Sequence, residues 1–192
     1  MIILLRHGET EFNREKRWQG HLDSSLTERG LDQAHQAAER LSARDIDIVI
    51  SSSLGRARRT ADIVGAAVNR PVATDERLWE VGFGDCDGMT EAEIEVKWPG
   101  LAAWREADRW NRATPNGESY GQVRARLQAF RDEYDLGALM ADPARCWLLV
   151  GHGRSHAILA GLLLDWPDNW IIETHLENAQ PYLLRQNDLE AL

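Results

Sequence analysis

Cysteine is nearly absent from this sequence. Only two of its 192 residues are cysteines, Cys86 and Cys146, and they lie far apart in the chain. Two cysteines at that spacing supply neither a disulfide framework nor the clustered thiolates of a zinc site, which fits a reducing cytosol. Long apolar runs are missing too, and the first residue leads into an apolar segment with no basic stretch before it. We therefore expect a cytoplasmic protein that does not associate with membranes.

Positive charge is also scarce. The 22 lysines and arginines are outnumbered by 31 aspartates and glutamates, so the formal net charge is −9. An acidic chain repels nucleic acid and anionic membranes at long range, which disfavours both as partners. A phosphorylated substrate would then need arginines gathered locally in a pocket. The length and the ordinary hydrophobic content of 43% predict one domain over residues 1–192, with a single sizeable core.

Short apolar runs alternate with amphipathic segments along the chain. This alternation predicts an α/β fold with a mostly parallel sheet. Strands are expected at residues 2–6, 46–51, 72–74, 146–150 and 181–184, and helices within 9–17, from near Thr27 to Leu41, and over 54–68, 118–140 and 155–164. From about residue 81 to residue 118 the chain is rich in glycine, proline and tryptophan, and we interpret this segment as an inserted cap of short helices and loops.

Two histidines stand at the ends of predicted strands. His7 follows the apolar run at residues 2–5, His152 follows the run at residues 147–150, and a glycine comes after each. Because the carboxyl ends of parallel strands meet at one edge of a sheet, both side chains are expected to converge there with the serine run at 51–53. Imidazole is a good nucleophile near neutral pH. The pair predicts phosphoryl transfer, in which His7 attacks phosphorus and His152 donates a hydrogen bond to the phosphate.

Arginines near these histidines fit the same chemistry. Arg6 adjoins His7, and Arg56, Arg58 and Arg59 begin the helix after the second strand, whose N-terminus is itself suited to anions. A planar guanidinium pairs bidentately with phosphate oxygens. An alkoxide leaving group would also need a proton, which a partly desolvated carboxyl group near the pocket could supply. The residue pattern alone leaves open which of the helix arginines and which carboxyl group act.

Several of these residues also have a purely structural interpretation. A single histidine after a strand is commonly structural, and Arg58 and Arg59 stand where solvated helix charges usually do. His152 and His156 could form a metal pair, but their spacer lacks the glutamate of the zinc-protease motif and contains a cation instead. Other residues are expected in ordinary places: His21, His35 and His175 at the surface or in loops, Trp98, Trp104 and Trp110 in the core of the cap, and Cys86 as an inert thiol.

Taken together, the motifs resemble those of the histidine phosphatase superfamily, the phosphoglycerate mutase-like proteins. The resemblance begins at Leu5-Arg6-His7-Gly8-Glu9-Thr10 with Asn13 and runs through nearly the whole chain. Its other segments are Gln19-Gly20 with Asp23, Leu26–Gly30, Ser51–Ala57 with Thr60-Ala61, Leu78–Glu80 with Phe83-Gly84 and Asp87-Gly88, Asn116–Ser119, and Gly151–Gly153. The resemblance implies a three-layer α/β/α sandwich.

The same resemblance implies roles for individual residues. His7 would be the phosphohistidine nucleophile, and Glu80 would be the proton donor to the leaving group. Arg6, Arg56 and His152 would complete the phosphate pocket, and the helix-start arginine of the family falls on Arg56. Auxiliary contacts to the substrate phosphate would come from Asn13, Gln19, Gly20 and Gly153. The implied partner is a small phosphorylated metabolite, no metal or other cofactor is expected, and the oligomeric state stays open, a homodimer included.

The chain departs from the family pattern in three places. Cys86-Asp87-Gly88 stands where Trp-Glu-Gly is frequent, Ser52-Ser53-Leu54 where Ser-Pro-Leu is frequent, and Arg154 where a small residue is common. No departure removes a group that the resemblance makes catalytic. Arg154 bears on the size and charge of the substrate that fits over the phosphate.

Three functions are compatible with these features. Transfer of the phosphoryl group to water would make a metal-independent phosphomonoester hydrolase, and transfer to a second hydroxyl of a retained intermediate would make a phosphoglycerate mutase. Residues 18–21 read Trp-Gln-Gly-His where such mutases typically carry Phe-Thr-Gly-Trp, and the longer mutase insertion before the second histidine is missing, which favours the phosphatase. A non-catalytic phosphate-binding protein is disfavoured, because His7, Arg56, Glu80 and His152 are all present.

Overall fold

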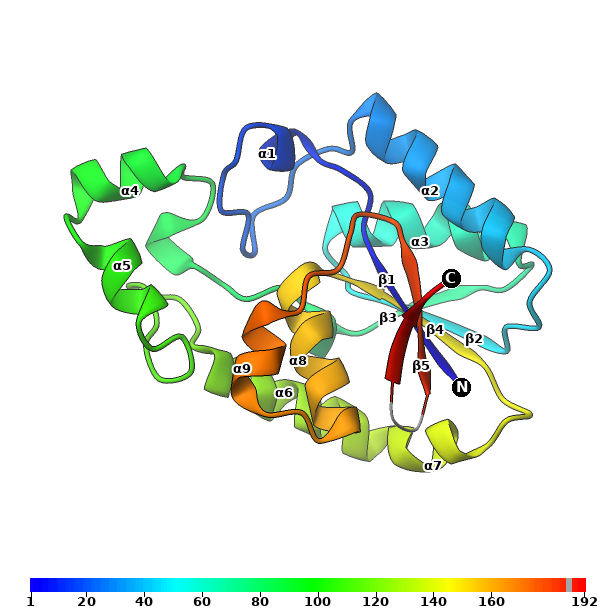
Figure 1. Ribbon diagram of the computed structural model, residues 1–192. Helices are drawn as coiled ribbons and strands as arrows, with labels where there is room; N and C mark the ends of the chain where they lie inside the picture. The colour runs from blue at the N-terminus through cyan, green and yellow to red at the C-terminus, as the bar shows by residue number, and fades with distance from the viewer. Residues whose placement is uncertain (186–187) are drawn as a thin grey trace.

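Six strands form one sheet in the computed structural model, which describes residues 1–185 and 188–192 (Figure 1). Across the sheet the order is β3 (Val72–Thr74), β2 (Ile48–Ser51), β4 (Trp147–Gly151), β1 (Ile2–Arg6), β5 (Pro181–Arg185) and β6 (Asp188–Ala191). The pairs β3–β2, β2–β4 and β4–β1 are parallel, whereas β5 is antiparallel to both β1 and β6. The predicted mostly parallel sheet is confirmed.

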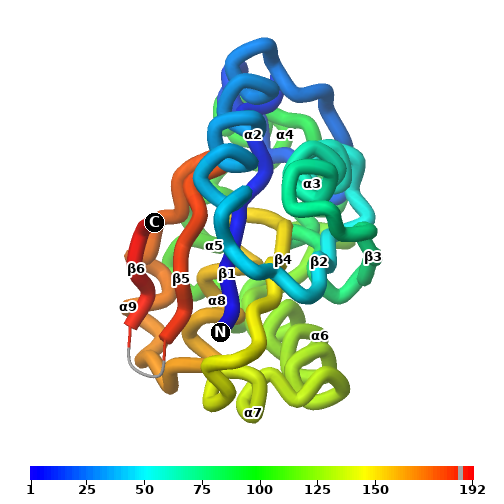
Figure 2. Tube along the Cα trace, turned by 90° about the vertical axis from the view of Figure 1, so that its right-hand side faces the viewer, coloured from blue at the N-terminus to red at the C-terminus, as the bar shows by residue number. Residues whose placement is uncertain are grey.

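Helices cover both faces of this sheet (Figure 2). α2 (Glu28–Leu41) and α3 (Gly55–Ala67) pack on one face, in the apolar cluster that contains Ile3 and Leu5. α6 (Tyr120–Glu133) and α8 (Gly153–Leu164) pack on the other face, in the cluster that contains Ile2 and Leu4. Alternate residues of a strand point to opposite faces, so an entirely apolar strand is buried on both sides. The three-layer α/β/α sandwich expected from the sequence is confirmed.

The register of the two central strands positions the candidate site. Arg6, the last residue of β1, lies opposite Gly151, the last residue of β4. One more hydrogen bond continues the pairing, since the His7 N–H donates to the Gly151 carbonyl at 2.9 Å. His7 and His152 therefore leave neighbouring strands at the same edge of the sheet, as the sequence predicted.

The prediction of one helix over residues 118–140 is wrong in the middle of that segment. α6 ends at Glu133 and α7 (Leu136–Ala141) begins after Asp135, whose backbone is left-handed with φ at 45°. The Asp135 side chain accepts a hydrogen bond from the Ala138 N–H. Such an N-cap starts a new helix by satisfying one of its free amides, so a continuous apolar stripe can span two separate helices.

Two short elements were not predicted, and two predicted helices have different bounds in the structure. α9 (Asp168–Glu173) has only six residues, and β6 has only four, most of them exposed. Neither element therefore has a strong periodic pattern in the sequence. α8 begins at Gly153 rather than Ser155. α1 (Glu11–Arg14) lies within the predicted short helix at 9–17.

The segment between β3 and α6 contains the predicted cap. Its helices, α4 (Glu91–Lys97) and α5 (Leu101–Glu106), lie beyond one side of the sheet (Figure 1). Trp110 packs edge-on against Tyr120 with ring centroids 5.6 Å apart, but Trp104 is 47% exposed, so its predicted place in the cap core is wrong. The single domain with a cap at about 81–118 stays a prediction. No helix in the described chain has the length and apolar character needed to cross a membrane.

Candidate active site

His7 lies just past the end of β1 with its side chain almost fully buried. Its ring nitrogen Nδ1 is 2.7 Å from the carbonyl oxygen of Gly8. A carbonyl oxygen can only accept, so Nδ1 must carry the hydrogen, and the lone pair of a neutral ring is then left on Nε2. This tautomer is the one that a nucleophilic histidine needs.

The surroundings of His7 keep its ring neutral. Burial lowers the pKa of His7 well below its usual range, and the nearby guanidinium groups of Arg56 and Arg6 lower it further. A protonated imidazole has no lone pair to offer. The burial and the positive charges that would attract a phosphate therefore also keep His7 Nε2 unprotonated at neutral pH.

His152 lies beside His7, with the two ring centroids 5.2 Å apart in an edge-on arrangement. Its Nε2 is 2.8 Å from the hydroxyl oxygen of Ser52, which comes from the end of the neighbouring strand β2. His152 is fully buried, and burial followed by the charge of Arg56 lowers its pKa well below the usual value. Ser52 fixes the orientation of the second histidine, a positioning role that the sequence motif did not reveal.

Two arginines approach the histidines from different elements. Arg56, in the first turn of α3, is only 2% exposed, and its guanidinium donates to the carbonyls of Leu22 and Gly20 and to Asp23. Arg6 donates from Nη1 to the Leu176 carbonyl at 2.9 Å. These contacts hold both guanidinium groups in place. The choice among the helix arginines agrees with burial, since Arg58 instead pairs with Asp62 on the partly exposed side of α3.

Three buried nitrogen atoms around this pocket have no hydrogen-bond partner among the described residues. They are Arg6 Nε, Arg56 Nε and His152 Nδ1. A buried donor without an acceptor is unfavourable by about 1–3 kcal/mol, more for a charged group, so native proteins rarely leave several together. An anion with several acceptor oxygens, such as a phosphoryl group, is the kind of ligand that such groups bind.

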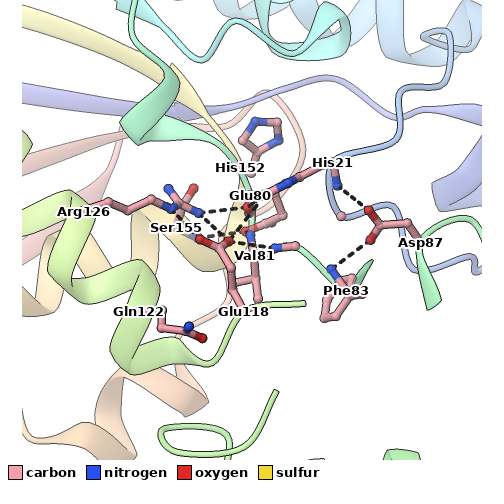
Figure 3. A network of polar contacts seen from close by, with 12 residues as sticks. His21, Glu80, Val81, Phe83, Asp87, Glu118, Gln122, Arg126, His152 and Ser155 are labelled. Carbon is pink, nitrogen blue, oxygen red and sulfur yellow. Dashed lines mark hydrogen bonds and ion pairs between the residues drawn. The ribbon is translucent and has the colours of Figure 1, made fainter. Parts of the chain in front are cut away.

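Glu80 reaches the same pocket and is held by the start of α8 (Figure 3). Its carboxylate accepts hydrogen bonds from the backbone amides of Val81 and Ser155 through Oε1, and of Arg154 through Oε2. Free amides at a helix N-terminus favour such an acceptor. Because α8 begins right after His152, this contact fixes a carboxyl group next to the second histidine.

A second network behind Glu80 fixes its backbone (Figure 3). The Glu80 carbonyl accepts hydrogen bonds from His21 Nε2 at 3.0 Å and from Arg126 Nη2 at 2.9 Å. Both donors also contact Glu118, and although burial opposes ionisation, these two partners lower the pKa of Glu118 to about 2. His21 was predicted as a surface or loop residue, and it lies half-buried in a turn. Its contacts with Glu80 and Glu118 were not predicted.

The four auxiliary residues lie around the pocket in different ways. The Gly20 carbonyl orients Arg56, and a side chain at Gly20 would collide with Asp87. Asn13 Oδ1 caps α1 through the Thr10 amide, and Gln19 is buried with Oε1 facing Ser24. A Cβ added to Gly153 would lie 3.6 Å from the Arg6 guanidinium. Their contacts with a substrate stay predictions.

Asn178 is a positioning residue that the sequence did not single out. Its Nδ2 donates to the His7 carbonyl at 2.9 Å and lies 3.4 Å from Asn13 Oδ1. It follows α9 in the chain, 171 residues after His7. No local motif joins residues so far apart, so only the fold shows that Asn178 holds the backbone of His7.

His156, the second histidine of the considered metal pair, is fully buried, and neither of its ring nitrogens has a hydrogen-bond partner in the described chain. Its ring lies against Gly151, where an added Cβ would come within 2.6 Å of Nε2. Burial lowers the pKa of His156 to about 3. These observations fit a neutral His156 ring that fills space beside β4 better than they fit a metal ligand.

Replacing His156 by leucine is expected to make the protein less sensitive to acid. The unfolded chain binds a proton near pH 6.5, whereas folded His156 does so only near pH 3, so its stability contribution is present above pH 6.5 and lost as the pH falls between these values. Between pH 7 and about pH 4 the wild type should lose roughly 3 kcal/mol more unfolding free energy than His156→Leu.

Urea unfolding at the two pH values measures this difference. The exposed His35 on α2 supplies the matched control, and His35→Leu should follow the wild-type pH dependence. Parallel curves for the wild type and His156→Leu would contradict a neutral buried His156.

Comparison with known proteins finds matches over nearly the whole chain. The family model described as "Histidine phosphatase superfamily (branch 1)" matches residues 2–190. A glucosyl-3-phosphoglycerate phosphatase of Mycolicibacterium vanbaalenii is 40% identical over 185 residues, covering 93% of this chain and 80% of the relative. The probable phosphoglycerate mutase GpmB of Erwinia tasmaniensis is 34% identical over 171 residues, covering 88% and 76%. A mycobacterial glucosyl-3-phosphoglycerate phosphatase in complex with inorganic phosphate superposes with a TM-score of 0.79 at 36% identity, covering 94% and 87%.

Proposed function

Since the chain belongs to branch 1 of the histidine phosphatase superfamily and is a phosphatase of that family, we propose that it hydrolyses a phosphomonoester through a phosphohistidine on His7. In the first step, His7 Nε2 forms a bond to phosphorus while the bond to the ester oxygen breaks. Arg6, Arg56 and His152 hold the three equatorial oxygens, on which the negative charge is spread. Glu80 gives its proton to the departing alkoxide.

Water completes the cycle in the second step. It attacks phosphorus and gives a proton to the Glu80 carboxylate, and the bond between phosphorus and His7 Nε2 breaks. Inorganic phosphate leaves, and both side chains return to their starting forms. Two observations support this scheme. Buried nitrogens of Arg6, Arg56 and His152 have no hydrogen-bond partner among the described residues, and the contact of His7 Nδ1 with the Gly8 carbonyl leaves the Nε2 lone pair free.

The proposed substrate is glucosyl-3-phosphoglycerate or a close analogue. Relatives named glucosyl-3-phosphoglycerate phosphatase are about 40% identical to this chain across nearly its whole length. The reaction requires no metal, because two arginines already supply the positive charge that the phosphoryl group needs. The second candidate, a phosphoglycerate mutase, has the support of the relative named GpmB.

Phosphate release from glucosyl-3-phosphoglycerate and from nitrophenyl phosphate tests the proposal. Both are expected to be hydrolysed at acid to neutral pH, with rates unchanged by a chelator such as EDTA. Rates that fall with chelator and return with a divalent cation would contradict the metal-independent reaction. Rapid interconversion of monophosphoglycerates that depends on bisphosphoglycerate, without net phosphate release, would establish the mutase instead.

A further inference from the structure

A small cavity of roughly 100 Å³ opens beside the phosphate pocket. It is lined by Arg6, Glu80, Gly153, Arg154, Thr174, His175 and Leu176. Arg6, Glu80 and Gly153 belong to the candidate active site described above. The other four come from the first turn of α8 and from the segment that follows α9, so this cavity extends the site toward groups that the reaction itself does not use.

Arg154 is the cation that this extension adds. We propose that its guanidinium binds a second anionic group of the substrate, a carboxylate near the phosphate ester, and so makes the enzyme selective for phosphorylated hydroxy acids. The proposal rests on the phosphatase function proposed above and concerns the substrate that the same site selects.

The contacts of Arg154 leave part of its guanidinium available. Nη1 donates to the carbonyls of Ile172 at 2.9 Å and Thr174 at 3.1 Å, at the end of α9. Within the described chain, neither Nε nor Nη2 donates a hydrogen bond, and no carboxylate side chain forms an ion pair with Arg154. The carbonyl contacts thus fix one edge of a planar group and leave the other edge free to pair with two oxygens.

Arg154 is one of several arginines in the described chain that form no ion pair, and its location sets it apart. Arg59 and Arg145 are exposed to solvent, whereas Arg154 lines the cavity beside the candidate active site. The nearest carboxylate to the Arg154 main chain is Glu80, which contacts its amide rather than its guanidinium. The Arg154 guanidinium therefore lies beside the phosphate pocket without an acidic side chain of the described chain to neutralise its charge.

The charges of a phosphorylated hydroxy acid match this arrangement. Its phosphate would occupy Arg6, Arg56 and His152, and its carboxylate would add a negative charge close by. In 3-phosphoglycerate only two carbons separate the ester oxygen from the carboxylate carbon, so the two anionic groups must bind next to one another. The short cavity that joins Arg6 to Arg154 suits that separation.

Two substrates that differ only in the carboxylate test the proposal. 3-Phosphoglycerate carries it, and glycerol 3-phosphate has a hydroxymethyl group in its place. The wild type is expected to favour 3-phosphoglycerate in kcat/KM. Arg154→Ala should lower kcat/KM for 3-phosphoglycerate about tenfold to hundredfold, mainly through KM, and change the value for glycerol 3-phosphate and nitrophenyl phosphate by less than about threefold.

Arg145→Ala is the matched control, because Arg145 is exposed and lies before β4, at the opposite end of that strand from the site. It should leave the preference unchanged. Arg154→Lys keeps the charge but loses the planar fork, so an intermediate preference is expected. This variant also carries the test if Arg154→Ala fails to fold, which thermal melting would reveal.

The outcomes separate this proposal from the proposed function. Equal losses for both substrates in the Arg154 variants would mean that Arg154 only docks α9, and a wild type without preference would overturn the proposal while the phosphatase stands. If the wild type does not hydrolyse even nitrophenyl phosphate, the proposed function fails and the carboxylate site fails with it.

Discussion

His7→Ala is expected to abolish turnover of every phosphomonoester. The substitution removes the only atom proposed to bond to phosphorus. We expect kcat to fall by at least about 10⁴-fold for alkyl and aryl esters alike. The matched control is His35→Ala on the exposed side of α2, which should keep the wild-type rate.

Covalent labelling distinguishes this role from simple binding. Rapid quenching with a ³²P-labelled phosphomonoester should give an acid-labile label on the wild type and none on His7→Ala. His152→Ala should still be labelled, although more slowly, because its ring is proposed to bind the phosphate rather than to attack phosphorus. Label on His7→Ala, or activity within tenfold of the wild type, would remove His7 as the nucleophile.

The sequence predicted a nucleophile at His7 because the signal is local. The apolar run at residues 2–5 must be a buried strand, and the parallel topology places its carboxyl end beside that of residues 147–150. His7 and His152 then come together without any knowledge of side-chain packing. The arginine was harder to assign, since the residue pattern alone does not separate Arg56, Arg58 and Arg59, which share one helix. The family resemblance selected Arg56, and its burial and its hydrogen bonds to Leu22 and Asp23 agree with that choice.

The sequence placed the serine run at 51–53 near the two histidines, but the individual contacts of the supporting residues could not be predicted, because their partners are distant in the chain. Ser52 contacts a histidine 100 residues away, and Asn178 contacts the His7 carbonyl across 171 residues. His21 acts through a backbone carbonyl, which has no side-chain identity for a motif to record. Such contacts depend on how loops pack after the sheet is formed. α9, whose end Arg154 holds, was missed for a related reason, because its six residues are too few for a clear periodic pattern.

Glu80→Gln is expected to separate leaving groups by their need for a proton. An alkoxide is a poor leaving group and depends on general acid catalysis, so alkyl phosphates such as 3-phosphoglycerate should lose about 10²–10³-fold in kcat. Nitrophenolate leaves with little protonation. For nitrophenyl phosphate, the rate constant of the step that releases nitrophenolate should therefore fall by less than about tenfold. Single-turnover kinetics isolates that step, because Glu80 is also proposed to accept a proton from water during hydrolysis of the phosphohistidine.

The geometry of Glu80 dictates the controls for this comparison. Both carboxylate oxygens accept backbone amides, so the amide nitrogen of glutamine must face an N–H donor and weakens the attachment to α8. Thermal melting measures that loss, and a displaced side chain would slow both substrates together. Glu76→Gln, an exposed change in the preceding turn, should affect neither. Equal losses for the two leaving groups in a well-folded Glu80→Gln would contradict Glu80 as the acid and assign it to holding the phosphate pocket in shape.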